Sequence, residues 1–152
     1  LLLSGAISHG RSILAALAAG ADFAYIGSAF LATAEASIDE EYKQMVVQSS
    51  AADIVNSSLF TGVHGNYLRG SIARAGLDAD QLASADPSSM SFATQSASPR
   101  KAWRDIWGAG QGIATSSSVE SAAQVVQRLS REFDTARRDL ESSAWSTNHA
   151  RP

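Results

Sequence analysis

The fold is decided by residues 1–28, which read LLLSGAISHGRSILAALAAGADFAYIGS. Residues 1–3 and 23–26 are short apolar runs, typical of strands that are buried on both faces in a parallel sheet. Each run ends in small residues, at positions 4–5 after the first and 27–28 after the second. A helix between the runs would complete a β-α-β unit. The pattern therefore predicts an α/β fold.

The stretch between the two runs has the spacing of a helix. Ile13, Leu14 and Leu17 lie on one helical face, and Gly20 suits the left-handed backbone that ends a helix. A right-handed crossover would bring the loops after both strands to the same edge of the sheet.

These two loops, SGAISHG (4–10) and IGS (26–28), are a candidate phosphate site. Small residues let backbone N–H groups approach an anion closely, and the start of a helix adds a positive partial charge. The alternative is that the glycines serve tight turns alone, and the residues leave both interpretations open.

The middle of the chain is expected to be a helical extension over residues 34–83. Acidic residues 39–41 suit the first turn of a helix, and an apolar stripe follows at Ile38, Tyr42, Met45 and Val46. Residues 53–65 are less periodic. Asn66 is a good cap, so a short helix is expected from Asn66 to Gly76.

The rest of the chain divides into a Ser-rich loop (84–98), C-terminal helices (99–143) and a frayed tail (144–152). Ser98-Pro99 predicts a helix start, with Trp103, Ile106 and Trp107 on one face. The spacing of Ser117 and Glu120 predicts a capping box for the last helix. The expected apolar stripe of that helix is Val119, Ala122, Val126, Leu129, Phe133 and Leu140.

Composition excludes several classes of protein. The chain has 152 residues, 45% of them hydrophobic, with no cysteine and a net charge of −3. The apolar fraction excludes a wholly disordered chain, and the lack of cysteine excludes disulfides, zinc ribbons and thiol catalysis. A nucleic-acid-binding protein would show an excess of basic residues, and this chain has none, so no nucleic-acid partner is predicted. The longest apolar run, Ile13–Ala19, is far short of the roughly 20 residues that span a bilayer. A cytoplasmic protein without membrane contact is expected, and the initial Leu1 indicates processing or a start inside a longer chain.

Few side chains suggest local chemistry. His9, His64 and His149 are too widely spaced for a metal site, so none is predicted. His9 is expected at a solvent-facing turn, with phosphate contact as the alternative. Trp103 and Trp107 are expected in the core. Gln111, in the GAGQG turn at 108–112, has donors and acceptors for a cofactor edge, although a helix stop explains that turn equally simply.

Residues 4–44 resemble the end of the barrel in nitronate monooxygenases, formerly called 2-nitropropane dioxygenases. The corresponding motifs are Gly5-Ala6-Ile7, Gly20-Ala21-Asp22, Gly27-Ser28 and Phe30-Leu31-Ala32-Thr33-Ala34-Glu35. Ala6 replaces a family glycine and Ser28 a threonine, and both departures are mild. Residues 66–76 and 101–112 also look like the family's C-terminal region.

The resemblance implies the C-terminal fragment of a (β/α)8 TIM barrel with additional C-terminal helices, in which residues 1–33 are the last β/α units. It also implies a flavoprotein that oxidises alkyl nitronates with O2 to carbonyl compounds and nitrite. By match, Gly5, Ala6, Gly27 and Ser28 would bind the FMN phosphate, with Gln111 as a further candidate cofactor contact.

The family's catalytic histidine lies upstream of these loops, and none of the three histidines here corresponds to it, so no catalytic residue is predicted in this chain. A full barrel takes about 250 residues. The chain alone is therefore expected to bind FMN poorly, to lack nitronate oxidation, and to expose apolar surface near residues 1–3 and 23–26.

Two alternatives remain open. The first is a flavin-dependent enoyl reductase with the same barrel, which would also use both phosphate loops. The second is a non-catalytic fragment that acts as a binding or interaction module.

Overall fold

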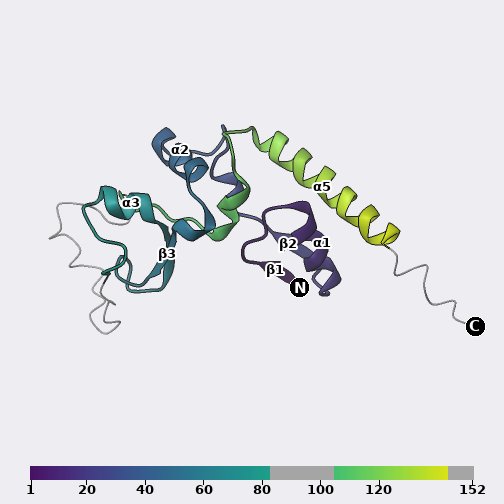
Figure 1. Ribbon diagram of the computed structural model, residues 1–152, viewed down its shortest axis with the longest axis horizontal. Helices are drawn as coiled ribbons and strands as arrows, with labels where there is room; N and C mark the ends of the chain where they lie inside the picture. The colour runs from purple at the N-terminus through teal and green to yellow at the C-terminus, as the bar shows by residue number, and fades with distance from the viewer. Residues whose placement is uncertain (83–104, 144–152) are drawn as a thin grey trace, which may run out of the picture.

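The computed structural model describes residues 1–82 and 105–143. Figure 1 shows two groups of elements. The first group contains β1 (Leu2–Ser4), α1 (Gly10–Ala18), β2 (Phe23–Tyr25) and α5 (Ala122–Ser142). The second contains α2 (Glu40–Gln48), β3 (Ile54–Ser57), β4 (Gly65–Leu68) and α3 (Arg69–Arg74). Two 3-10 helices that contact each other, η1 (Ser28–Phe30) and η5 (Gln111–Thr115), lie between the groups.

The predicted β-α-β unit is confirmed. Strands β1 and β2 are parallel, with Leu2 opposite Phe23 and Ser4 opposite Tyr25. Helix α1 connects them and ends before Gly20, whose φ of +91° is in the left-handed region that favours glycine. The sequence pattern was sufficient to predict this unit, because all the residues that pair between β1 and β2 lie within the first 25 residues.

The predicted helical extension over residues 34–83 contains the helices α2 and α3 but also two strands that were not predicted. Helix α2 forms as expected, but β3 and β4 pair as an antiparallel hairpin in which Asn56 faces Asn66. Asn66 is therefore a strand residue, and α3 begins three residues later, at Arg69. The second partner of β4 explains the difference, because Leu68 N donates to Trp107 O at 2.8 Å. That pairing crosses nearly 40 residues, so no local pattern could indicate it.

The last helix starts later than predicted. Ser121 caps α5 and forms a capping box with Gln124, whereas the predicted cap, Ser117, precedes the helix. Glu120 instead forms a parallel bridge with Thr33.

The buried face of α5 also differs from the predicted stripe. Leu129 is buried as expected, together with Val125 and Ala136. Val126 and Leu140 are 55% and 63% exposed. The contact with α1 determines which face is buried, and the local sequence does not contain that information.

Two apolar clusters form the core of the second group. Trp107 is buried with Val46, Leu68 and Ile113, whereas Ile106 is buried with Phe60 and Ile72. Ile106 and Trp107 thus contribute to different clusters rather than to one helical face. The predicted core position of Trp107 is confirmed. Trp103, the Ser98-Pro99 start, the 84–98 loop and the 144–152 tail lie outside the described residues.

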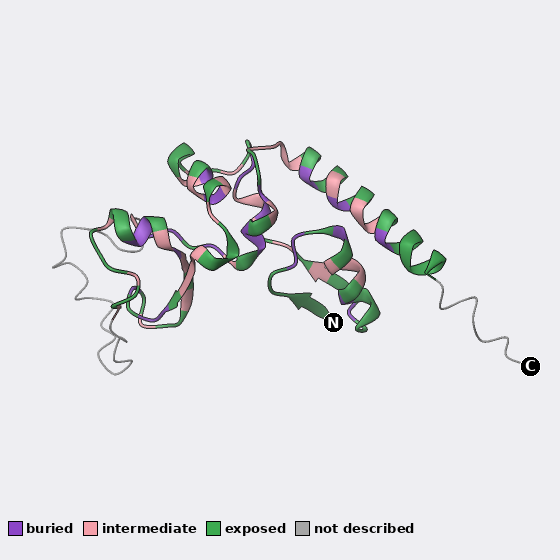
Figure 2. Cartoon of the chain, viewed as in Figure 1, coloured by how far each residue is buried: buried purple, intermediate pink, exposed green. Residues whose placement is uncertain are grey.

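The strands β1 and β2 contain exposed apolar residues, as expected, and Figure 2 colours β1 as exposed. Leu1, Leu2 and Leu3 are 79%, 55% and 41% exposed, and Phe23 and Tyr25 are 67% and 60% exposed. Among the described residues, we find no helix with the length and apolar character that crossing a membrane requires.

Candidate functional site

The two candidate loops leave neighbouring strands at the same edge of the sheet. Ser4 is the register partner of Tyr25, so Gly5 follows one strand directly and Gly27 lies two residues beyond the other. Gly5 has a φ of +106°, and Ala6 has a φ of +52°, a left-handed conformation that a residue other than glycine seldom adopts. A Cβ on Gly5 would meet no heavy atom within 4 Å, and one on Gly27 would lie 3.9 Å from the nearest, Tyr25 Cε1. The backbone of both loops is therefore open to a ligand.

The second loop continues directly into η1. Gly27 is the residue before the helix, and no side chain caps it. Within the described part of the chain, the amides of Ser28 and Ala29 have no hydrogen-bond acceptor, as expected for the first residues of a helix. Ser28 is half-buried and Ala29 is only 2% exposed, so these two unpaired amides lie at the margin of the protein interior rather than on an open surface.

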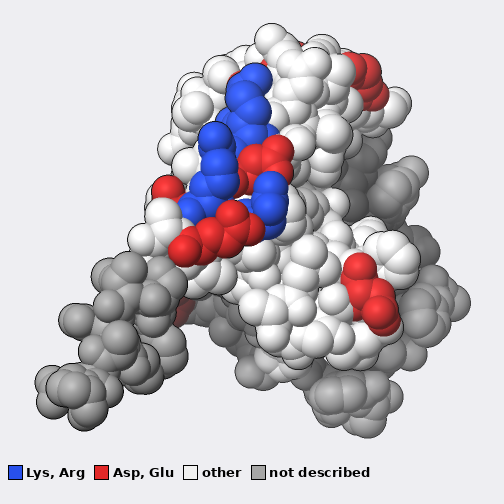
Figure 3. Space-filling model, turned by 90° about the vertical axis from the view of Figure 1, so that its right-hand side faces the viewer, with Lys and Arg blue, Asp and Glu red and all other residues white. Residues whose placement is uncertain are grey.

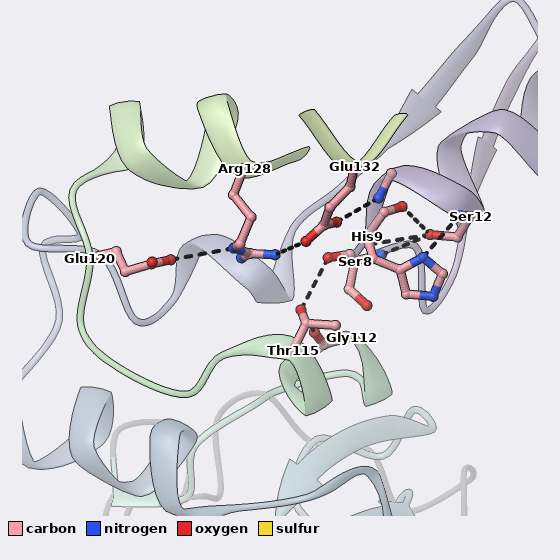
Figure 4. Close-up of polar contacts among 9 residues, drawn as sticks. Ser8, His9, Ser12, Gly112, Thr115, Glu120, Arg128 and Glu132 are labelled. Carbon is pink, nitrogen blue, oxygen red and sulfur yellow. Dashed lines mark hydrogen bonds and ion pairs between the residues drawn. The ribbon is translucent and has the colours of Figure 1, made fainter. Parts of the chain in front are cut away.

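The start of α1, by contrast, is already occupied by the protein's own groups (Figure 4). Gly10 N donates to Glu132 Oε2 at 2.8 Å, and Ser12 N donates to His9 Nδ1 at 3.0 Å. The carboxylate of Glu132 neutralises the positive end of this helix. The expectation that the start of α1 would add charge to a phosphate site is therefore wrong, because an acid from α5, 122 residues away, takes that place.

A third segment, the GAGQG turn with η5, contacts both loops. Gly110 N donates to Ser28 Oγ at 2.9 Å, on the second loop. Thr115 Oγ1 donates to the carbonyl of Ser8 at 3.1 Å, on the first loop (Figure 4). Between these contacts, Gly112 is buried, and a Cβ there would lie 3.4 Å from Ser8 Cβ and 3.6 Å from Ser28 Cβ. The turn therefore packs against both loops of the candidate site.

A stack of side chains anchors this turn from the other end. The rings of Tyr42 and Trp107 are parallel, with centroids 4.7 Å apart, and the Arg74 guanidinium lies 3.7 Å from the centroid of the Trp107 ring. The Tyr42 hydroxyl donates to the carbonyl of Gly108. Burial raises the pKa of the Tyr42 phenol, so the donor remains protonated well into the alkaline range. Trp107 thus acts as a core residue that holds the chain just before the turn.

The residues predicted for the site are found as follows. Gly5, Ala6 and Gly27 are exposed, and Ser28 is half-buried with its hydroxyl bound by Gly110. Gln111 is exposed at the start of η5, and its side chain makes no hydrogen bond to a described residue.

The sequence does not predict Thr115 at this site, nor the individual contacts of Ser8 and Gly110, although both lie in segments that it indicates. Their contacts join positions 82 and 107 residues apart. The only sequence signal for these contacts is the repeated glycine of the GAGQG turn at 108–112, which is equally typical of a helix end.

The histidines form no common site. His9 is exposed and caps α1, whereas His64 Nδ1 lies 2.7 Å from Asn56 Oδ1 in the β3–β4 hairpin. His149 lies outside the described residues. Within residues 1–82 and 105–143, no group of three or more His, Asp or Glu side chains could hold a metal ion.

The charged surface at the α5 end of the molecule is mixed in sign. On the face that Figure 3 shows, acidic and basic side chains are interleaved. Arg11 pairs with Asp139 at 3.2 Å, and Arg137 pairs with Glu141 at 3.1 Å. On α5, such pairs match the solvated helix surface that the sequence predicted.

Comparison with known proteins relates this chain to a family of oxidoreductases. The profile of the family described as Nitronate monooxygenase matches residues 1–132. A protein named Nitronate monooxygenase from Paraburkholderia phytofirmans is 30% identical over 140 residues, which are 87% of this chain and 37% of that protein.

Solved structures show the same fold. A nitroalkane oxidase from Streptomyces ansochromogenes is 29% identical with a TM-score of 0.65, over 91% of this chain and 40% of that one. FabK from Thermotoga maritima is 20% identical with a TM-score of 0.64, over 92% of this chain and 46% of the FabK chain. Because these structures are TIM barrels, the α/β fold described above matches part of such a barrel. The chain spans about two fifths of the length of these relatives.

Proposed function

Because the chain belongs to the nitronate monooxygenase family, we propose that the complete protein is an FMN-dependent oxidoreductase. In this proposal it oxidises alkyl nitronates with molecular oxygen and releases carbonyl compounds and nitrite.

One observation carries the proposal. The two loops emerge side by side from paired parallel strands, with open backbone at Gly5 and Gly27 and with amides at Ser28 and Ala29 that find no acceptor among the described residues. Main-chain N–H groups gathered in this way suit a dianionic phosphate. A TIM barrel commonly binds a phosphate at the loops after its last two strands. The residues present therefore fit the phosphate of FMN.

The roles of this chain's residues follow from their positions. The phosphate would be held by Gly5, Ala6, Gly27 and Ser28. Gln111 directly follows Gly110, whose amide contacts Ser28, so its side chain would bind another part of the cofactor. Bound FMN would supply the redox chemistry on the nitronate and oxygen. His9 and His64 already have partners of their own, so we assign the proton-handling role to neither.

The proposed reaction is tested with the complete protein that contains this chain. Purified protein loaded with FMN is expected to release nitrite from propionate-3-nitronate with consumption of oxygen. Rapid oxidation of a nicotinamide cofactor in place of nitrite release would favour the enoyl reductase alternative. If the complete protein binds no flavin at all, the proposal is wrong and the binding-module alternative gains support.

A charge change in the loops tests the phosphate site. Gly27→Asp would place a carboxylate where the open backbone lies, and its non-positive φ of −117° tolerates a side chain. Repulsion between like charges is expected to weaken FMN binding by about tenfold or more. The matched control is Ala123→Asp, which adds the same charge at an exposed position of α5. Equal FMN affinity in both variants would contradict a phosphate site at this edge.

A further inference from the structure

Segment 110–115 contacts both candidate phosphate loops, and the chemistry of its contact with Ser28 has a consequence for anion binding. A serine hydroxyl has one proton to donate and two lone pairs that accept. The Gly110 amide, 2.9 Å away, uses a lone pair of Ser28 Oγ. Within the described residues, the hydroxyl proton has no acceptor. The contact therefore leaves Ser28 ready to donate.

We propose that Gly110 is a positioning residue for the cofactor phosphate: its amide fixes the Ser28 hydroxyl so that the hydroxyl proton is presented to the anion. This inference rests on the proposed function, since it concerns the same phosphate. It extends that function to a turn that lies 82 residues beyond the loop it serves.

The packing around the turn supports the assignment. A Cβ on Gly110 would lie 3.0 Å from Ser28 Oγ, which is tighter than nine in ten real Cβ contacts. A side chain at this position would therefore force the Ser28 hydroxyl to shift by a few tenths of an ångström from its present place. At the other end of the segment, Thr115 Oγ1 binds the Ser8 carbonyl at 3.1 Å. Segment 110–115 therefore links the two loops through one hydrogen bond to each.

The test compares FMN with riboflavin, which lacks the phosphate, in the complete protein. Ser28→Ala is expected to weaken FMN binding by about tenfold or more, because a hydrogen bond to a charged group is lost. Riboflavin affinity is expected to change by less than about twofold in the same variant, since the isoalloxazine contacts are untouched. Ser28→Thr retains the hydroxyl and is expected to retain the preference for FMN.

Gly110→Ala tests the positioning step itself. Its methyl group would force the Ser28 hydroxyl to shift by a few tenths of an ångström, so the ratio of FMN to riboflavin affinity is expected to fall in the same direction as in Ser28→Ala. When Gly110→Ala is combined with Ser28→Ala, the ratio of FMN to riboflavin affinity is expected to be little lower than in Ser28→Ala alone. Both changes affect the same interaction, so their effects should not add. Gly108→Ala is the matched control: its Cβ would lie an ordinary 3.5 Å from Asn66 O and touch neither loop.

The outcomes separate this inference from the proposed function. A wild-type protein that binds neither flavin would overturn both. A wild-type protein that prefers FMN, with the same preference in Ser28→Ala and Gly110→Ala, would overturn the positioning role and leave the proposed function intact. Equal weakening of both flavins would also overturn it, because that result indicates a structural role alone.

Discussion

Gly10 is the residue at which the first and last helices of the chain meet. A Cβ at this position would lie 2.0 Å from the backbone nitrogen of Phe133 and 2.3 Å from the backbone carbon of Glu132. Both are main-chain atoms of α5, so no side-chain rotation could relieve the overlap. The close approach also allows the Gly10 amide to reach Glu132 Oε2. One glycine thus determines both the packing distance and the charge balance at the start of α1.

We expect Gly10→Ala to separate α1 from α5 and to lower the free energy of unfolding by about 3 kcal/mol. Urea denaturation of the chain, followed by circular dichroism, measures the loss. Gly108→Ala is the control, because its Cβ has space, and its stability should remain within about 0.5 kcal/mol of the wild type. A Gly10→Ala variant as stable as this control would show that the helices do not approach as closely as described.

The local sequence predicted the residues of the two loops but not their long-range contacts. The two loops were identified because small residues follow short apolar runs, a pattern contained within 28 residues, whereas the assignment of Gly5, Ala6, Gly27 and Ser28 to a phosphate came from the family resemblance and stays a prediction. Gly10 also belonged to the first loop, yet its role depends on Glu132, which no local pattern connects to it. The contacts of a residue can therefore be predicted from sequence when its partners lie nearby in the chain. They cannot be predicted when the partner lies in a distant element, as Glu132 does for Gly10.

At the level of elements, acidic side chains contact α5 at its start and along its length, in addition to its buried apolar face. Glu35, the last residue of the family-like motif 30–35, accepts from Ala122 N at the start of α5 at 2.8 Å. Arg128 lies between two further acids (Figure 4): its Nε is 3.6 Å from Glu120 Oε2, and its Nη1 is 3.3 Å from Glu132 Oε1. Because Glu132 also binds Gly10 N, this chain of polar contacts joins the Thr33–Glu120 bridge to the start of α1.

Removing Arg128 tests whether these contacts stabilise the fold. Its side chain is 21% exposed, and without it two partly buried carboxylates would face each other. We expect Arg128→Ala to cost about 1–2 kcal/mol of unfolding free energy. Arg137→Ala is the matched control, since Arg137 forms its pairs on the same helix with 51% of its side chain exposed. That variant should lose no more than about 0.5 kcal/mol.

Thermal and urea unfolding of both variants at low and high salt provide the comparison. Salt should reduce the effect of Arg137→Ala more than that of Arg128→Ala, because exposed pairs are screened more strongly. Equal losses in the two variants would indicate that the position of α5 depends on apolar packing alone.

Elements were predictable to the extent that their partners were close in sequence. Helix α1 and its two strands agree with their pattern, as does α2, whose acidic first turn was expected. Strands β3 and β4 were missed because four-residue strands carry little periodicity, and β4 gains a second partner from residues 107–109. The start of α5 shifted from Ser117 to Ser121 because residues 119–120 extend along residues 32–34 before the helix begins.

At the level of the whole molecule, the chain has a hydrophobic core on one side and an open sheet on the other. Two parallel strands are too few to cover their own edges, and unpaired edges with apolar side chains promote association. The five apolar residues at positions 1–3, 23 and 25 are each at least 41% exposed. In a complete barrel, further strands would lie beside such a pair.

We therefore expect the chain, when produced alone, to self-associate through β1 and β2 and to bind FMN weakly. Sedimentation velocity should show a weight-average mass that rises with concentration, and a dye that binds exposed apolar surface should fluoresce. Leu2→Lys combined with Phe23→Lys would place charges on opposite residues of the strand pair, and it should reduce both signals. Leu140→Lys, at a 63% exposed position of α5, is the control and should leave both unchanged. A chain that remains monomeric at all concentrations, or a control that is as effective as the strand variant, would show that the open face of this sheet does not drive association.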